Sequence, residues 1–123
     1  MIYEQHKERK IVREIKFRAW VESGDYKEML PNVQRHIGAA TGFGHLLQNT
    51  AKGYEKVYVM QYTGLKDKNG IEIYEGDVVY IAGHGNYICE FPFLELYEAG
   101  AENDIGAILG NIHQNPELIE DKL

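Results

Sequence analysis

The sequence predicts a mainly β domain, a small barrel or roll, and three observations carry that prediction. Apolar and polar residues alternate with a period of two in several short segments, as expected for strands with one buried face. Turn residues separate these segments at short intervals, which is typical of small all-β domains. The 123-residue chain also contains 13 glycines and 9 tyrosines, a composition that favours turns and strands.

The first half of the chain predicts a hairpin followed by a loop. Alternation predicts a strand over Glu14–Val21, with Phe17 buried. The turn residues Ser23-Gly24-Asp25 follow, and Tyr26–Leu30 is expected to return as a second strand. Residues 32–55 contain four glycines that interrupt any helical pattern, so we interpret this stretch as a long glycine-rich loop.

The second half predicts a succession of strands and one short helix. The expected strands are Lys56–Tyr62, Val78–Ala82, Tyr87–Phe93 and Ile105–Ile112, with a shorter extended segment over Ile71–Tyr74. The residues expected to be buried in them are Val57, Val59, Val79, Ile81 and Ile108.

A short helix is expected to close the domain. Asn115-Pro116 has the form of a helix N-cap followed by proline at the first helical position. Glu117–Leu123 is therefore predicted to be a C-terminal helix.

Composition excludes several classes of protein. No apolar run approaches the roughly 20 residues that span a bilayer, and the first residues lack the apolar core of a secretory signal, so we expect a cytoplasmic protein without membrane contact. A single cysteine excludes an internal disulfide and a cysteine-based zinc cluster. Residues 69–123 contain 11 acidic residues and a single basic residue, Lys122, and the whole chain has a net charge of −6. Domains that bind a nucleic-acid duplex usually carry an excess of basic residues, so this charge argues against that class.

The chemistry-bearing residues predict no catalytic, cofactor or metal site. The segment Gly38–His45 lacks the Gly-Lys-Ser/Thr ending of a phosphate-binding loop, and no two histidines have the four-residue spacing of a helical metal site. Cys89 lies among apolar neighbours, which indicates a packed thiol. Asp77 follows Gly76 in a tight turn, where a carboxylate caps backbone amides.

One aromatic and basic set is a candidate partner surface. On an extended strand Lys16, Arg18 and Trp20 share one face, and Lys66 and Lys68 could extend the basic strip. Cations beside aromatic rings suit single-stranded nucleic acid, through phosphate contacts and base stacking. The alternative is a cation–π contact of Arg18 with Trp20 or with a core tyrosine, which only stabilises the fold.

Three segments together resemble the YopX family of bacteriophage and prophage proteins. They are Glu14–Trp20, Gln61–Val79 (the most specific of the three) and Gly110–Leu118. The resemblance implies a β-rich domain with an SH3-like core over residues 14–123, preceded by an N-terminal extension over residues 1–13. It carries over no catalytic residues.

These observations favour a non-enzymatic macromolecule-binding module, an accessory protein of a phage or prophage that binds a host or phage protein or single-stranded nucleic acid. A self-assembling structural protein is the first alternative, and a small hydrolase or nucleotide-binding protein is the second. The asymmetric charge also predicts a homo-oligomer in which the acidic segment Glu90–Asp104 lies near the basic strand Arg13–Arg18 of a neighbour.

Overall fold

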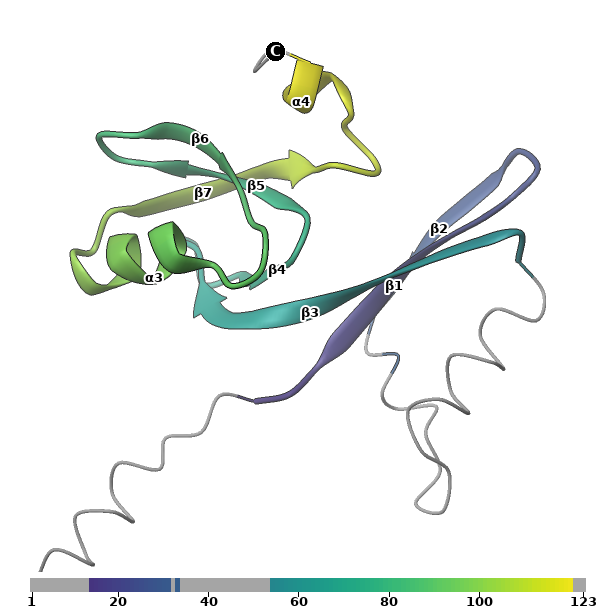
Figure 1. The fold of residues 1–123 in the computed structure, drawn as a ribbon, viewed down its shortest axis with the longest axis horizontal. Helices are drawn as coiled ribbons and strands as arrows, with labels where there is room; N and C mark the ends of the chain where they lie inside the picture. The colour runs from purple at the N-terminus through teal and green to yellow at the C-terminus, as the bar shows by residue number, and fades with distance from the viewer. Residues whose placement is uncertain (1–13, 32, 34–53, 121–123) are drawn as a thin grey trace, which may run out of the picture.

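The computed structural model of the chain describes residues 14–31, 33 and 54–120 (Figure 1). The expected N-terminal extension lies outside the described residues, as do most of the glycine-rich loop and the last three residues. Within the described part, no helix has the length and apolar character needed to cross a bilayer.

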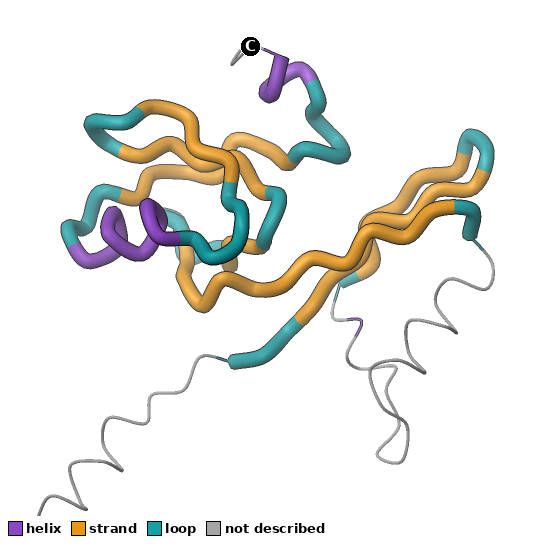
Figure 2. The backbone as a smooth tube through the Cα atoms, in the orientation of Figure 1, coloured by secondary structure: helices purple, strands orange, loops and turns teal. Residues whose placement is uncertain are grey.

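Four strands form an antiparallel sheet with the order β2-β1-β3-β4. They are β1 (Phe17–Ser23), β2 (Tyr26–Leu30), β3 (Lys56–Lys66) and β4 (Glu72–Tyr74). A tight turn through Gly24, whose φ of 61° suits glycine, joins β1 to β2. The hairpin and the first half of β3 make a twisted ribbon that extends away from the rest of the domain (Figure 2).

The remaining strands form a second antiparallel sheet with the order β6-β5-β7. They are β5 (Asp77–Ile81), β6 (Gly85–Ile88) and β7 (Ile105–Asn111). The helix α3 (Leu94–Ala101) connects β6 to β7, and the short α4 (Glu117–Glu120) follows β7. This sheet, α3 and β4 make a compact lobe at one end of the ribbon (Figure 1).

The predicted fold class is confirmed: the domain is mainly β, curled like a small roll, with a short helix at its C-terminal end. The predicted strands are displaced by a few residues. The first starts at Phe17 rather than Glu14, and β3 continues to Lys66 because it turns from one partner, β1, to another, β4.

The prediction of a strand over Tyr87–Phe93 is wrong beyond Ile88, and α3 was not foreseen. Phe93 adopts a left-handed conformation, with φ 63° and ψ 33°, and its side chain is fully buried at the start of the helix. Leu96 and Ala99 then follow at helical spacing and are buried as well. In the sequence, the alternation of apolar and acidic residues at the start of this segment hid the helical spacing of its buried residues.

Two apolar clusters stabilise the domain. The lobe packs β5 against α3, through a cluster that comprises Ile73, Val79, Ile81, Cys89, Phe93, Leu96 and Ala99. The ribbon has a second cluster of Ala19, Val21 and Val33, against which the side chains of Phe17, Val57 and Val59 pack. The expectation of full burial holds for Val79 and Ile81, whereas Phe17, Val57, Val59 and Ile108 are half-buried.

Asp67 ties the turn between β3 and β4 to strand β7. One carboxylate oxygen accepts hydrogen bonds from the N–H groups of Asn69 (2.8 Å) and Ile71 (2.9 Å), and the other accepts from the N–H of Ile108 (3.0 Å). Burial acts to raise the pKa of Asp67, but the three backbone donors outweigh it, so the pKa of Asp67 lies below its ordinary value of 3.8.

We expect Asp67→Ala to lower the free energy of unfolding by about 2–3 kcal/mol, because three backbone donors lose a charged acceptor. Because folding lowers this pKa, the contribution of the carboxylate is complete above pH 3.8 and is lost as the pH falls through the folded-state value. Urea unfolding at several pH values measures both effects. The matched control is Asp25→Ala, in the exposed hairpin turn. Equal acid sensitivity of Asp67→Ala and the wild type would contradict this account.

Candidate functional site: a groove between the two sheets

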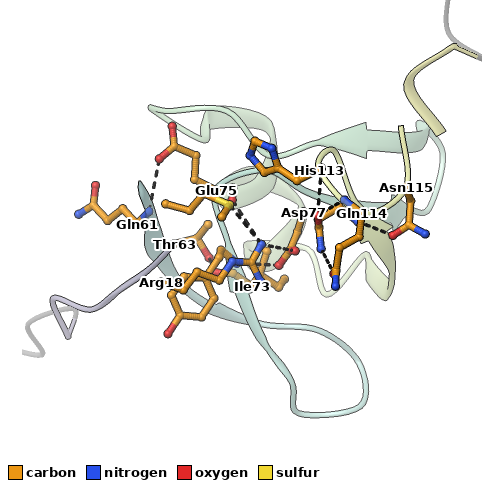
Figure 3. A network of polar contacts seen from close by, with 12 residues as sticks. Arg18, Gln61, Thr63, Ile73, Glu75, Asp77, His113, Gln114 and Asn115 are labelled. Carbon is orange, nitrogen blue, oxygen red and sulfur yellow. Dashed lines mark hydrogen bonds and ion pairs between the residues drawn. The ribbon is translucent and has the colours of Figure 1, made fainter. Parts of the chain in front are cut away.

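A buried ion pair joins the two sheets. Strand β1 positions Arg18 toward the lobe, where its Nη2 donates to Oδ1 of Asp77 at 2.7 Å (Figure 3). The side chain of Arg18 is 13% exposed and that of Asp77 is 3% exposed. The guanidinium also lies over the ring of Tyr74, 4.8 Å from its centroid. The predicted cation–π contact of Arg18 with a core tyrosine is thus present.

Asp77 serves the tight turn as well as the ion pair. Its second oxygen, Oδ2, accepts from the N–H of Tyr74 at 2.8 Å, across the turn Glu75-Gly76. The predicted turn-capping role of Asp77 is therefore confirmed, and its pairing with Arg18 is what sequence reasoning missed. Burial raises the pKa of Asp77 above its ordinary value, although Arg18 acts to lower it.

The predicted aromatic and basic set is divided by the fold. Arg18 and Trp20 share one face of β1, with Lys16 directly before the strand, but this face is turned toward the lobe. Lys16 pairs with Glu72, and Trp20, only 5% exposed, donates from Nε1 to Glu22 at 2.8 Å. Arg18 and Trp20 are therefore not available as an open nucleic-acid surface.

The other two members of the set lie elsewhere. Lys66 and Lys68 are exposed at the far end of β3 and in the turn that follows it. The N–H of Lys68 donates to the carbonyl of Gly106 at 3.1 Å, so this turn lies against β7.

His113, in the loop after β7, packs against the aromatic side chains of the ribbon. Its ring stacks on Trp20 with 6.2 Å between centroids and contacts Tyr58 with 4.7 Å between centroids. Burial lowers the pKa of His113 below its ordinary value, and the positive charge of Arg18 lowers it further. Sequence analysis did not foresee this contact, because the turn that brings His113 back to β3 is a tertiary feature.

A groove of about 610 Å³ runs between the first half of β3 and the lobe. The residues along β3 are Val57, Tyr58, Val59 and Met60. The opposite wall and floor are formed by Glu75, Gly76, Ile88, Cys89, Glu90, Ile112, His113 and Ile119. Tyr58 is 40% exposed at its rim. The groove is thus mostly apolar, and its ionisable groups besides the buried thiol are two carboxylates, a histidine and the phenol of Tyr58.

A network of asparagines positions the wall that carries Ile112 and His113. The side-chain oxygen of Asn115 accepts from the N–H of Asn111 at 3.1 Å, and Oδ1 of Asn111 accepts from the N–H groups of His113 and Gln114 (Figure 3). Gly110 is required here, because a Cβ at this position would lie 2.4 Å from Oδ1 of Asn115. The Gly-Asn…Asn-Pro pattern is thus a turn that places the groove wall.

The groove offers little to a reaction. Cys89 is fully buried, and burial raises the pKa of its thiol to about 12, the opposite of an activated nucleophile. The prediction of a packed thiol is confirmed. Among the residues that the structure describes, no cluster of three or more His, Cys, Asp or Glu side chains could hold a metal ion. His84 lies exposed in the turn before β6, while His36 and His45 fall outside the described residues.

We expect Arg18→Met to lower the free energy of unfolding by about 3–5 kcal/mol, because it leaves the carboxylate of Asp77 buried without its cation. The double variant Arg18→Met/Asp77→Asn should lose less than the sum of the two single variants. Urea denaturation measures all three. Lys16→Met is the control, because its more open ion pair predicts a smaller loss. Strict additivity of the two single losses would show that the pair is not coupled.

No curated protein matches the chain. Among solved structures, the crystal structure of protein EF1440 from Enterococcus faecalis is similar, at 26% sequence identity and a TM-score of 0.44, over 87% of this chain and 99% of that chain. The family model described as YopX protein matches residues 16–120, which include the ion pair, the Asp67 turn and the groove. The chain therefore belongs to the YopX family.

Proposed function

We propose that this chain is a non-enzymatic, protein-binding accessory module of a bacteriophage or prophage, acting in the cytoplasm of the bacterial host. A segment of the partner protein enters the groove between β3 and the lobe. The single observation that carries the proposal is this groove of about 610 Å³, which lies between β3 and the lobe and has a mostly apolar lining.

The lining favours a bulky apolar side chain. Met60, Ile88 and Ile112 line the groove, and Tyr58 stands partly exposed at its rim. Burying one leucine or phenylalanine side chain of a partner contributes about 1.5–3 kcal/mol. A few such contacts, less the cost of association, correspond to a moderate, reversible affinity.

Charge favours a basic protein segment over nucleic acid. Glu75 and Glu90 contribute carboxylates to the groove, and the lowered pKa of His113 leaves its ring neutral at pH 7. Phosphates would be repelled by the carboxylates, whereas lysine or arginine would be attracted. The partner segment is thus expected to carry a cation next to its apolar side chain.

Selection from a random linear-peptide library on the immobilised protein tests this function. We expect enriched peptides to combine a bulky apolar residue with an adjacent Lys or Arg. Tyr58→Ser and Glu90→Lys should each weaken binding about tenfold, as measured by fluorescence anisotropy of a labelled peptide. The matched controls are Tyr80→Ser, exposed on the other sheet, and Glu102→Lys, exposed after α3; both should bind as the wild type does.

Two outcomes would overturn the proposal. One is a selection that returns only peptides insensitive to Tyr58→Ser and Glu90→Lys. The other is tight binding of a labelled single-stranded oligonucleotide that competes with the peptides, which would assign the groove to nucleic acid.

Self-association is a second candidate, favoured by one exposed apolar pair. Phe91 and Leu94 are 67% and 61% exposed at the start of the acidic segment Glu90–Asp104. Lys16 and Arg18, the expected basic counterpart, are paired within their own chain. An assembly of this kind would therefore depend mainly on apolar burial at Phe91 and Leu94.

Light scattering at micromolar concentration tests this assembly. If it forms, Phe91→Ser/Leu94→Ser should reduce the particle mass to the 14.1 kDa of one chain, because apolar burial supplies most of the affinity. Ile71→Ser, at another exposed apolar residue, is the control and should leave the mass unchanged. A wild-type mass near 14.1 kDa would exclude the oligomer.

A further inference from the structure

The first half of β3 is an edge of its sheet, and this edge borders the groove. Strand β1 pairs with β3 from Lys56 to Gln61, whereas the pairing of β3 with β4 runs only from Tyr62 to Lys66. The segment Lys56–Met60 therefore has a strand on one side alone among the described residues, and the groove lies on the other side.

The hydrogen-bond pattern shows which backbone groups point into the groove. The N–H of Tyr62 donates to the carbonyl of Lys16 at 2.9 Å, so the backbone of Tyr62 faces β1. In an antiparallel pair every second residue has the same orientation, so Tyr58 and Met60 also face β1. The backbone N–H and C=O groups of Val57 and Val59 consequently point away from β1, toward the groove.

Gln61 shows what these outward groups can bind. It has the same orientation as Val57 and Val59, and its carbonyl accepts from the N–H of Glu75 at 2.8 Å, while its own N–H donates to Oε1 of Glu75 at 3.3 Å (Figure 3). No such partner meets Val57 or Val59 within the described part of the chain. Their side chains pack on the opposite face, against the ribbon cluster, and so do not cover the edge.

We infer that the partner segment binds as an added β-strand, hydrogen-bonded to the backbone of Val57 and Val59. This inference rests on the proposed function and specifies the conformation of the ligand, an extended peptide. Strand addition uses main-chain hydrogen bonds for affinity and pockets for alternate side chains for specificity. Here one set of alternate side chains enters the groove on the face of Tyr58 and Met60, with Glu75 and Glu90 beside it.

Amide hydrogen exchange, followed residue by residue by NMR, tests this geometry. The probe is a peptide from the library selection described above. In the free protein the amides of Val57 and Val59 should exchange fast, and those of Tyr58 and Met60 slowly, because only the latter two donate to β1. Saturating peptide should slow exchange at Val57 and Val59 at least about tenfold, with little change at Tyr58 and Met60.

Removing single backbone N–H groups, first in the protein and then in the peptide, provides a second test. Val59→Pro removes an N–H group that points away from β1, so it breaks no β1–β3 hydrogen bond, and proline is tolerated in a sheet at such an edge. We expect this variant to bind the peptide at least about tenfold more weakly. Val59→Ala keeps the N–H and is the matched control. Methylation of single backbone nitrogens in the peptide should abolish binding at every second residue and be tolerated at the residues between. This test leaves the protein unchanged and so does not depend on folding of the proline variant.

The outcomes separate the two proposals. A peptide that binds in the groove without protecting Val57 and Val59, and that tolerates N-methylation at every residue, would overturn strand addition and leave the binding function intact. The absence of any peptide sensitive to the groove variants would overturn both.

Discussion

The buried ion pair between Arg18 and Asp77 is the interaction on which the arrangement of the two sheets depends. Its partners are 59 residues apart in the sequence and belong to different sheets. Asp77 also accepts from the backbone of Tyr74, so one carboxylate fixes both the turn into β5 and the position of β1. Isolated charges are costly to bury, and the cation and the backbone donor offset part of that cost for Asp77, whose pKa burial still holds above its ordinary value.

The ion pair also determines where the groove lies. Because Arg18 reaches into the lobe, the neighbouring Trp20 on the same face of β1 is brought under His113 rather than into solvent. The loop after β7 is thereby held near β3 but does not pair with it. Between them, among the described residues, lies a strip of β3 edge without a partner strand, next to apolar side chains. This strip, rather than the basic residues of β1, is where we propose that a partner segment binds.

Much of the fold was predictable from local patterns. Ser23-Gly24-Asp25 and Gly76-Asp77 marked turns, and Asn115-Pro116 marked the start of the last helix, because their conformational preferences act over a few residues. Alternation located most of the strands, although β3 proved longer than expected and β6 overlaps the predicted strand over Tyr87–Phe93 only at Tyr87 and Ile88. Helix α3 escaped because its apolar residues also alternate over a short stretch, and burial of Phe93 in the lobe decides the conformation there. The displaced strand ends have the same origin, since pairing partners determine where a strand stops.

The site was less predictable than the fold. Sequence alone determined a mainly β domain of the YopX type, a packed Cys89, and an Asp77 bound to its own turn, because these follow from residue type and near neighbours. Tertiary structure decided that Arg18 is bound by Asp77, that His113 contacts Tyr58 and Trp20, and that one side of the first half of β3 has no partner strand among the described residues. Each of these depends on which distant strands pair and in which register, and such pairings are selected by the energy of the whole domain rather than by any local segment.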